Sequence, residues 1–136
     1  MRPAAIIKMG YFPTDEPVLE ILKTYIRPAE EGKGRLLDPC AGEGIAARAL
    51  GQALNCETWG TELSPVRAEL AAKVMDKVYP TAWQACQMTD ESITLLFLNP
   101  PYEYDRHDSH KRLEVEFLKS TTPKLVRGGL LVFIIP

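Results

Sequence analysis

The sequence predicts a single α/β domain in which helices alternate with the strands of a doubly wound parallel sheet. Three observations lead to this class. First, short apolar segments of strand type alternate with longer segments of helical periodicity, a pattern that favours parallel pairing through right-handed crossovers. Second, the chain has 136 residues, which is enough to bury a core within one domain. Third, 46% hydrophobic and 25% charged residues are ordinary values for a globular protein.

The first half of the chain contains two expected helices and one expected strand. A helix begins at Thr14 or Asp15, either of which can cap it, with Pro17 tolerated in the first turn. Its apolar residues recur at helical spacing. A short strand follows at residues 35–38, and an alanine-rich helix is expected at residues 45–54, where small side chains suit close packing on a sheet.

The second half repeats this alternation. A strand at residues 57–61 precedes Ser64 and Pro65, which form a strong helix start, and this helix is expected to continue to about residue 78. The remaining elements are expected strands at residues 81–85, 93–98 and 130–135, a helix at 113–125, and a turn at Gly128 and Gly129.

Composition and charge narrow the function classes without choosing one. A net charge of −2 provides no basic field that would indicate nucleic-acid binding, but it does not forbid such binding. The three cysteines lie far apart, which fits neither a disulfide framework nor a zinc site, so we expect a cytoplasmic location. The apolar runs are too short for a signal peptide or a membrane span, so we expect no membrane association.

The stretch LLFLNPPY at residues 95–102 is the one around which the site is expected to form. Its apolar half predicts a buried strand, which Pro100 and Pro101 end because they lack backbone donors and fix φ. The residue before a proline favours extended geometry, which holds Asn99 at the carboxyl end of the strand, where open parallel sheets bind ligands. The Asn99 amide, the Pro100 carbonyl and the Tyr102 ring together suit a planar amine or amide. The same residues would also be found in a proline-rich turn that carries a surface tyrosine.

A second informative stretch, DPCAGEG at residues 38–44, follows the first expected strand. Gly42 and Gly44 permit a tight turn and close approach of a ligand to the backbone. Glu62, after the next strand, is placed to accept hydrogen bonds from ribose hydroxyls. This combination predicts a cofactor that carries adenosine. Asp38 would repel a pyrophosphate but attract a cation, which favours S-adenosylmethionine over a nicotinamide dinucleotide; the N-terminus of the following helix would also favour this carboxylate.

The two motifs together resemble the class I S-adenosylmethionine-dependent methyltransferases, and within them the amino-methyltransferases of the N6-adenine DNA type. DPCAGEG is similar to the family's cofactor-binding motif, and NPPY matches its catalytic motif at all four positions. The resemblance implies a Rossmann-like sheet of strand order 3-2-1-4-5, followed by strands 6 and 7 that this sequence lacks. We therefore expect residues 1–136 to be a methyltransferase domain that is incomplete at its C-terminus, or one whose strand 5 edge is covered by a second copy or a partner chain.

The resemblance also assigns roles to individual residues. Asn99 and the carbonyl of Pro100, within a motif completed by Pro101, would accept hydrogen bonds from the target amino group. Tyr102 would stack on a target base flipped out of a duplex. The residues expected to hold S-adenosylmethionine are Tyr11, Phe12, Thr14, Asp38, Pro39, Cys40, Ala41, Gly42, Gly44, Glu62, Leu63, Gln87 and Asn99. Among them, Gln87 is the candidate for contact with the adenine amine.

The substrate implied by the resemblance is the N6 amine of adenine in DNA, so nucleic acid is the expected partner. A protein glutamine amide or an RNA base amine fits the same geometry, and a non-catalytic cofactor-binding or partner-binding subunit is a further alternative, with a dehydrogenase the most distant. The polar loop at residues 105–112 has no recognised metal-ligand spacing, so no metal is expected. Its Arg106, Lys111 and Arg112 would suit contact with a nucleic-acid backbone.

Overall fold

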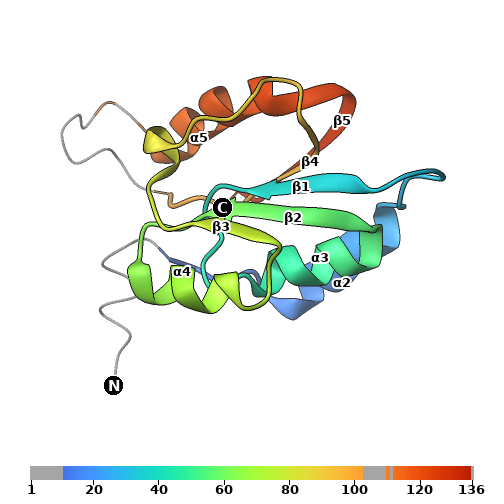
Figure 1. The fold of residues 1–136 in the computed structure, drawn as a ribbon, viewed down its shortest axis with the longest axis horizontal. Coiled ribbons are helices and arrows are strands. Elements are labelled where there is room, and N and C mark those ends of the chain that lie inside the picture. Colours follow the sequence, from blue (N-terminus) through green and yellow to red (C-terminus); the bar gives the residue numbers. More distant parts are fainter. Residues whose placement is uncertain (1–10, 103–109, 111, 136) are drawn as a thin grey trace.

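The computed structural model describes residues 11–102, 110 and 112–135. Within them the chain forms a five-stranded parallel sheet of order β3-β2-β1-β4-β5 (Figure 1). This confirms the expected α/β class and strand order. The strands are β1 (Gly34–Asp38), β2 (Cys56–Thr61), β3 (Lys77–Tyr79), β4 (Ile93–Leu98) and β5 (Leu125–Phe133). The helices are α2 (Glu16–Tyr25), α3 (Ile45–Leu54), α4 (Pro65–Ala72) and α5 (Leu113–Thr121), with short 3₁₀ helices η1 (Trp83–Ala85) and η2 (Thr122–Lys124).

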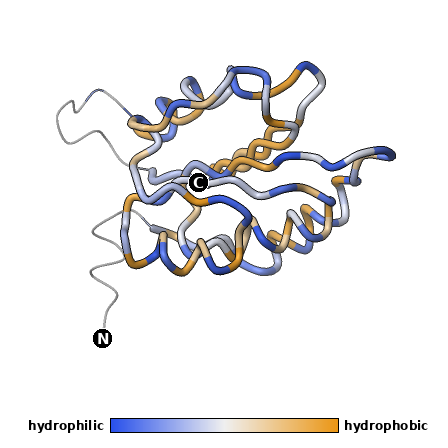
Figure 2. The backbone as a smooth tube through the Cα atoms, in the orientation of Figure 1, coloured by the Kyte–Doolittle hydropathy of each residue, from blue (hydrophilic) through white to orange (hydrophobic). Residues whose placement is uncertain are grey.

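The sheet is covered on both faces, which explains the continuous apolar runs in its central strands. Helices α2, α3 and α4 lie on one face, and η1 and α5 lie on the other (Figure 1). Successive strand residues point to opposite faces, so Leu36 of β1 joins the core cluster on the α3 side and Leu37 joins the cluster on the α5 side. In β4 the same alternation buries Leu95, Leu96 and their two successors, and Figure 2 shows this strand coloured as hydrophobic.

The prediction of a third strand at residues 81–85 is wrong. Strand β3 comes earlier, at Lys77–Tyr79, and the end of the predicted range forms η1. Helix α4 stops well before residue 78 because long-range hydrogen bonds redirect the chain toward β2. The Asp76 carboxylate accepts from the Thr58 backbone N–H at 2.7 Å, and the Asp76 N–H donates to the Thr58 hydroxyl at 2.9 Å. Residues 58 and 76 are far apart in the sequence, so their contact does not alter the local hydrophobic periodicity from which the helix was predicted.

The last helix and strand also differ from the prediction. Helix α5 is shorter than expected, and β5 begins at Leu125 instead of residue 130. Gly128 and Gly129, expected to form a turn, lie inside β5 beside a register shift against β4, and Gly128 has φ of 80°. A bulge accommodates additional residues without ending a strand. A glycine pair alone does not distinguish a bulge from a turn.

Strand β5 forms one edge of the sheet within the described residues. Leu130 and Leu131 on this strand are 51% and 39% exposed, which agrees with the expectation of an apolar edge. An apolar edge strand is able to pair with another strand. That a C-terminal segment, a second copy or a partner chain covers this edge stays a prediction. Among the described residues, no helix has the length and hydrophobicity needed to cross a membrane.

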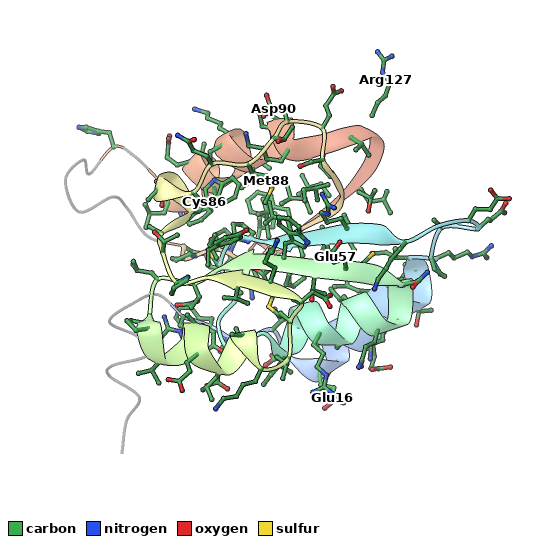
Figure 3. The ribbon with its side chains drawn as sticks, viewed as in Figure 1. Glu16, Glu57, Cys86, Met88, Asp90 and Arg127 are labelled. Atoms are coloured by element: carbon green, nitrogen blue, oxygen red, sulfur yellow. The ribbon has the colours of Figure 1, made fainter. Side chains whose placement is uncertain are left out.

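The connection from η1 to β4 runs along the α5 side of the sheet without a helix of its own. Figure 3 labels Cys86, Met88 and Asp90 along its course. The Lys124 ammonium holds the connection by donating to the Met88 carbonyl at 2.9 Å and pairing with the Asp90 carboxylate at 2.6 Å. Because β4 is parallel to β3, this connection carries the chain away from the carboxyl ends of the strands.

Candidate active site

A cavity of about 550 Å³ lies at the carboxyl ends of β1, β2 and β4. This is the end of an open parallel sheet at which ligands bind. The predicted site residues that line it are Tyr11, Phe12, Thr14, Asp38, Pro39, Cys40, Ala41, Glu62, Leu63, Asn99 and Pro101. The structure therefore brings both sequence motifs and the end of β2 to one cavity.

Asp38 and Asn99 share this cavity because β1 and β4 pair directly. Leu37 of β1 lies opposite Leu96 of β4 in a parallel register. Asp38 is the last residue of β1, and Asn99 follows the last residue of β4. Since both strands end at nearly the same level, their two polar side chains reach the same space.

The Asp38 carboxyl is buried at the wall of the cavity, with only 2% of the residue exposed. Burial raises the pKa of Asp38 to about 7; the backbone N–H of Cys40, which donates to the carboxylate at 3.0 Å, opposes the rise, and the charge of Glu62 adds to it. A cation bound beside Asp38 would favour its ionised form. Burial also raises the pKa of the Cys40 thiol, so this thiol stays protonated near neutral pH.

The glycine turn shapes the cavity without lining it. Gly42 and Gly44 have φ of 57° and 81°, and Gly44 is the N-cap of α3. The ring of Tyr11 lies directly on Gly42, since a Cβ added at that position would fall 2.2 Å from the Tyr11 ring. A glycine is therefore required both by the backbone conformation and by this close approach.

Glu62 is 5% exposed, and one of its two carboxylate oxygens accepts three hydrogen bonds. Its Oε1 accepts from the Ser64 N–H at 2.9 Å and from the Arg67 Nη2 and Nε at 2.8 and 3.1 Å. Its Oε2 accepts from the Gly42 N–H at 2.8 Å. Arg67 itself lines the cavity and was not identified from the sequence, because a single arginine on an amphipathic helix carries no distinguishing pattern.

The side-chain amide of Asn99 has a defined orientation. Its Nδ2 donates to the Phe12 carbonyl at 3.2 Å and to the Thr14 hydroxyl at 2.9 Å. A backbone carbonyl only accepts hydrogen bonds, so the Phe12 contact fixes which end of the amide is nitrogen. The Asn99 Oδ1 therefore faces away from this segment, toward Tyr102.

Tyr102 does not line the cavity in this structure. Its hydroxyl lies 3.0 Å from Asn99 Oδ1 and also contacts the Ile134 carbonyl, just after β5. Burial raises the pKa of Tyr102, so the hydroxyl remains a donor. The stacking role expected for this ring requires it to leave these contacts.

Gln87 is not among the residues that line the cavity, so its expected contact with adenine stays a prediction. The cavity is lined instead by Thr81, Ala82, Trp83 and Gln84. The difference follows from the misplaced third strand: the residues just after β3, and not those after residue 85, reach the carboxyl end of the sheet. Pro100, which is buried, does not line the cavity either.

The polar loop considered for metal or nucleic-acid contact lies mostly outside the described residues. Only His110 and Arg112 of residues 105–112 are described, so the expected roles of Arg106 and Lys111 stay predictions. In the part of the chain that the structure describes, no three His, Cys, Asp or Glu side chains form a group that could hold a metal ion.

Residues 2–136 match an uncharacterised methyltransferase family, DUF6094. The match covers nearly the whole chain, so the protein belongs to this family. No curated protein matches the sequence.

Solved structures with the same fold include several methyltransferases. The YcgJ protein from Bacillus subtilis has a TM-score of 0.64 and 17% identity, over 86% of this chain and 49% of that one. TYW2 from P. horikoshii, solved in complex with MeSAdo, has a TM-score of 0.65 and 13% identity, over 94% and 46%. A SAM-dependent methyltransferase from Leishmania major has a TM-score of 0.62 and 18% identity, over 85% and 49%. These matches confirm a Rossmann-like methyltransferase fold, and the chain spans about half the length of each of these proteins.

The buried state of Asp38 predicts a pH-dependent stability. Its pKa is raised from 3.8 to about 7 in the folded protein, so between these values the native state keeps a proton that the unfolded state has lost. This contribution to stability is complete below pH 4 and is lost as the pH rises toward 7, by about 1.4 kcal/mol per pH unit. Urea unfolding of wild type and of Asp38→Asn from pH 4 to 8 should therefore show a falling difference between the two proteins. Parallel pH profiles would mean that the pKa of Asp38 is the same in the folded and the unfolded protein.

Proposed function

We propose that this domain is an S-adenosylmethionine-dependent methyltransferase that acts on a planar amino nitrogen. The observation that supports it best is the shared cavity of Asp38 and Asn99, which combines a buried acidic wall with an oriented carboxamide. Membership of a methyltransferase family supports the reaction class. The substrate is inferred from the chemistry of the site and from the NPPY motif.

The chemistry of the cavity walls fits this cofactor. The Asp38 carboxyl suits the cationic methionine end, because opposite charges attract strongly at a poorly solvated site. Glu62 Oε2 accepts only the Gly42 N–H among the described residues, which leaves it capacity for a ribose hydroxyl. Leu63, Ala82 and Trp83 offer apolar surface for adenine. Bound S-adenosylmethionine would supply a methyl group activated by its sulfonium.

On the acceptor side, the NPPY motif implies Asn99, which lines the cavity, and the Pro100 carbonyl, which has to become accessible from the cavity for this role. An sp2 amine that donates one N–H to each oxygen would have its nitrogen held in one plane and one direction. The Asn99 carbonyl oxygen has two lone pairs, so the Tyr102 hydroxyl leaves one of them for the acceptor. No strong base is needed for this reaction, since the proton is able to leave after transfer. Catalysis is then mostly positioning and electrostatics.

The preferred acceptor is the N6 amine of adenine in DNA, because all four residues of NPPY agree with that class of methyltransferase. The target base would be flipped from its duplex to reach the cavity. A protein glutamine amide or an RNA base amine presents the same planar nitrogen, and a non-catalytic subunit that only binds cofactor is the second candidate. A net charge of −2 does not choose among these.

Substitution of Asn99 by Ala tests the catalytic assignment. Labelled methyl transfer from S-adenosylmethionine to DNA, RNA and protein should fall about a hundredfold or more, because loss of a positioning group costs factors of this size. Asn55→Ala is the matched control, since Asn55 is the other asparagine of the chain and donates to the Gly32 carbonyl at the opposite end of the sheet.

Each outcome of this experiment has a defined meaning. Labelling of DNA by wild type alone supports the preferred substrate, and labelling of RNA or protein selects one of the others. Equal labelling by wild type and Asn99→Ala would show that the catalytic assignment is wrong. Cofactor binding without labelling of any acceptor would favour the non-catalytic subunit.

A pair of substitutions at Tyr102 separates its ring from its hydroxyl. We expect Tyr102→Ala to weaken methyl transfer by about tenfold to a hundredfold, because base stacking on an aromatic ring contributes about 1–3 kcal/mol. Tyr102→Phe keeps the ring and should cost about fivefold or less, the size of a single neutral hydrogen bond. If Tyr102→Phe is as damaging as Tyr102→Ala, the hydroxyl contact with Asn99 and not stacking is the function of this residue. Steady-state kinetics on the labelled acceptor provide the measurement.

A further inference from the structure

Residues 11–14 form a short segment, here called the strap. It contacts Gly42 on one side of the cavity and Asn99 on the other. At one end the Tyr11 ring lies on Gly42, and the Arg67 guanidinium stacks over it at 4.6 Å from the ring centroid. At the other end Phe12 and Thr14 accept the two hydrogen bonds of the Asn99 amide. The strap therefore connects the glycine turn with the candidate catalytic side chain.

Arg67 connects the first of these contacts with Glu62. The guanidinium donates to Glu62 Oε1 through Nη2 and Nε, and its side chain is only 13% exposed. A cation–π contact is stronger when the cation is desolvated in this way. One arginine thus holds a carboxylate through hydrogen bonds in its plane and an aromatic ring through its face.

The position of Arg67 in its helix gives an independent reason to look for a role. It lies in the first turn of α4, where the Ser64 N-cap side chain accepts from its backbone N–H. A positive charge at a helix N-terminus is disfavoured by the helix dipole. Arg67 therefore does not serve the stability of α4, and its contacts with Glu62 and Tyr11 are what compensate for its placement.

We propose that Arg67 is a positioning residue that sets the orientation of the Asn99 carboxamide through the strap. The contacts form one chain. Glu62 accepts from Arg67, Arg67 stacks on Tyr11 at the start of the strap, and the rest of the strap accepts from Asn99. Loss of the guanidinium leaves the Tyr11 side chain held by packing on Gly42 and by the hydrogen bond between its hydroxyl and the Glu43 backbone. The face of the ring then has no partner from α4, so the strap and its hydrogen bonds to Asn99 loosen. The significance for methyl transfer rests on the proposed function, whereas the coupling itself is a property of the protein without ligand.

The coupling works in both directions, because an effect of one site on another is thermodynamically reciprocal. A ligand bound against Glu62 would exclude water from the Glu62–Arg67 pair, which strengthens the attraction between the two charges and, through the strap, the orientation of Asn99. Binding at the ribose end of the cavity would then prepare the acceptor end. An acceptor would bind better to the protein already loaded with cofactor.

The chain offers a direct spectroscopic test, because Asn55 and Asn99 are its two asparagines. Selective ¹⁵N labelling of asparagine gives two side-chain amide signals, and that of Asn55, which donates to the Gly32 carbonyl, serves as an internal reference. In Arg67→Met we expect the Asn99 side-chain signal to shift toward that of a solvated amide, while the Asn55 signal stays in place. Arg127→Met, a change at an exposed arginine of β5, should move neither signal.

Tyr11→Leu provides a second route to the same result if Arg67→Met does not fold. It removes the ring but keeps the Glu62–Arg67 pair, and should shift the Asn99 signal in the same direction. The double variant should add little to either single change, since both break one chain of contacts. Calorimetry with S-adenosylhomocysteine should show about tenfold weaker binding to Arg67→Met, because the ligand must then order a strap that Arg67 holds in place in the wild type.

The outcomes distinguish this inference from the proposed function. An Asn99 signal that stays unchanged in a folded Arg67→Met or Tyr11→Leu overturns the inference, even if cofactor affinity falls. A shifted Asn99 signal in a protein that binds no S-adenosylhomocysteine supports the coupling and contradicts the proposed cofactor. Additive shifts in the double variant would mean that Arg67 and Tyr11 act on Asn99 separately, which also overturns it.

Discussion

The direct parallel pairing of β1 with β4 determines where the polar side chains of the site lie. Leu36 and Leu37 of β1 lie opposite Leu95 and Leu96 of β4, and all four are buried with 4% exposure or less. A shift of this register by one residue would turn every one of these side chains to the wrong face of the sheet. Burial therefore fixes the register, and the register fixes the level at which Asp38 and Asn99 leave the core.

The cavity above these strand ends concentrates charge in a poorly solvated place. Two carboxyl groups, Asp38 and Glu62, are buried within it, and one arginine compensates Glu62. Burial of an uncompensated carboxylate is costly, which is why the pKa of Asp38 rises to about 7. A site of this kind gains most from a ligand that brings its own positive charge, and a sulfonium donor does so without the repulsion that a pyrophosphate would meet.

Much of the fold and part of the site follow from local sequence. The buried run at residues 93–98 and the prolines after it define β4 and its end, and Gly42 and Gly44 define the turn before α3. The errors share a cause. The hydrogen bonds between Asp76 and Thr58 end α4 early, and a bulge keeps Gly128 inside β5. Both depend on partners that are distant in sequence, which periodicity does not register.

The same limit applies within the site. Asp38, Glu62 and Asn99 stand beside strand ends and were predicted from that position, whereas Arg67 was not. Its role depends on a stacked ring from the strap and a carboxylate from the end of β2, which only the folded chain brings together. Gln87 does not line the cavity for a related reason. The third strand was predicted a few residues too late, so the residue expected just after that strand was also too late in the sequence.

One cavity between the ends of β1 and β4 is expected to bind a sulfonium donor. Calorimetric titration of the wild-type protein with S-adenosylmethionine and, separately, with NAD tests it most directly. We expect saturable binding of S-adenosylmethionine at one site and no binding of NAD. In Asp38→Asn the affinity for S-adenosylmethionine should be about tenfold weaker through loss of one charge contact. Binding of NAD in preference to S-adenosylmethionine, or affinity for S-adenosylmethionine that is unchanged by Asp38→Asn, would contradict it.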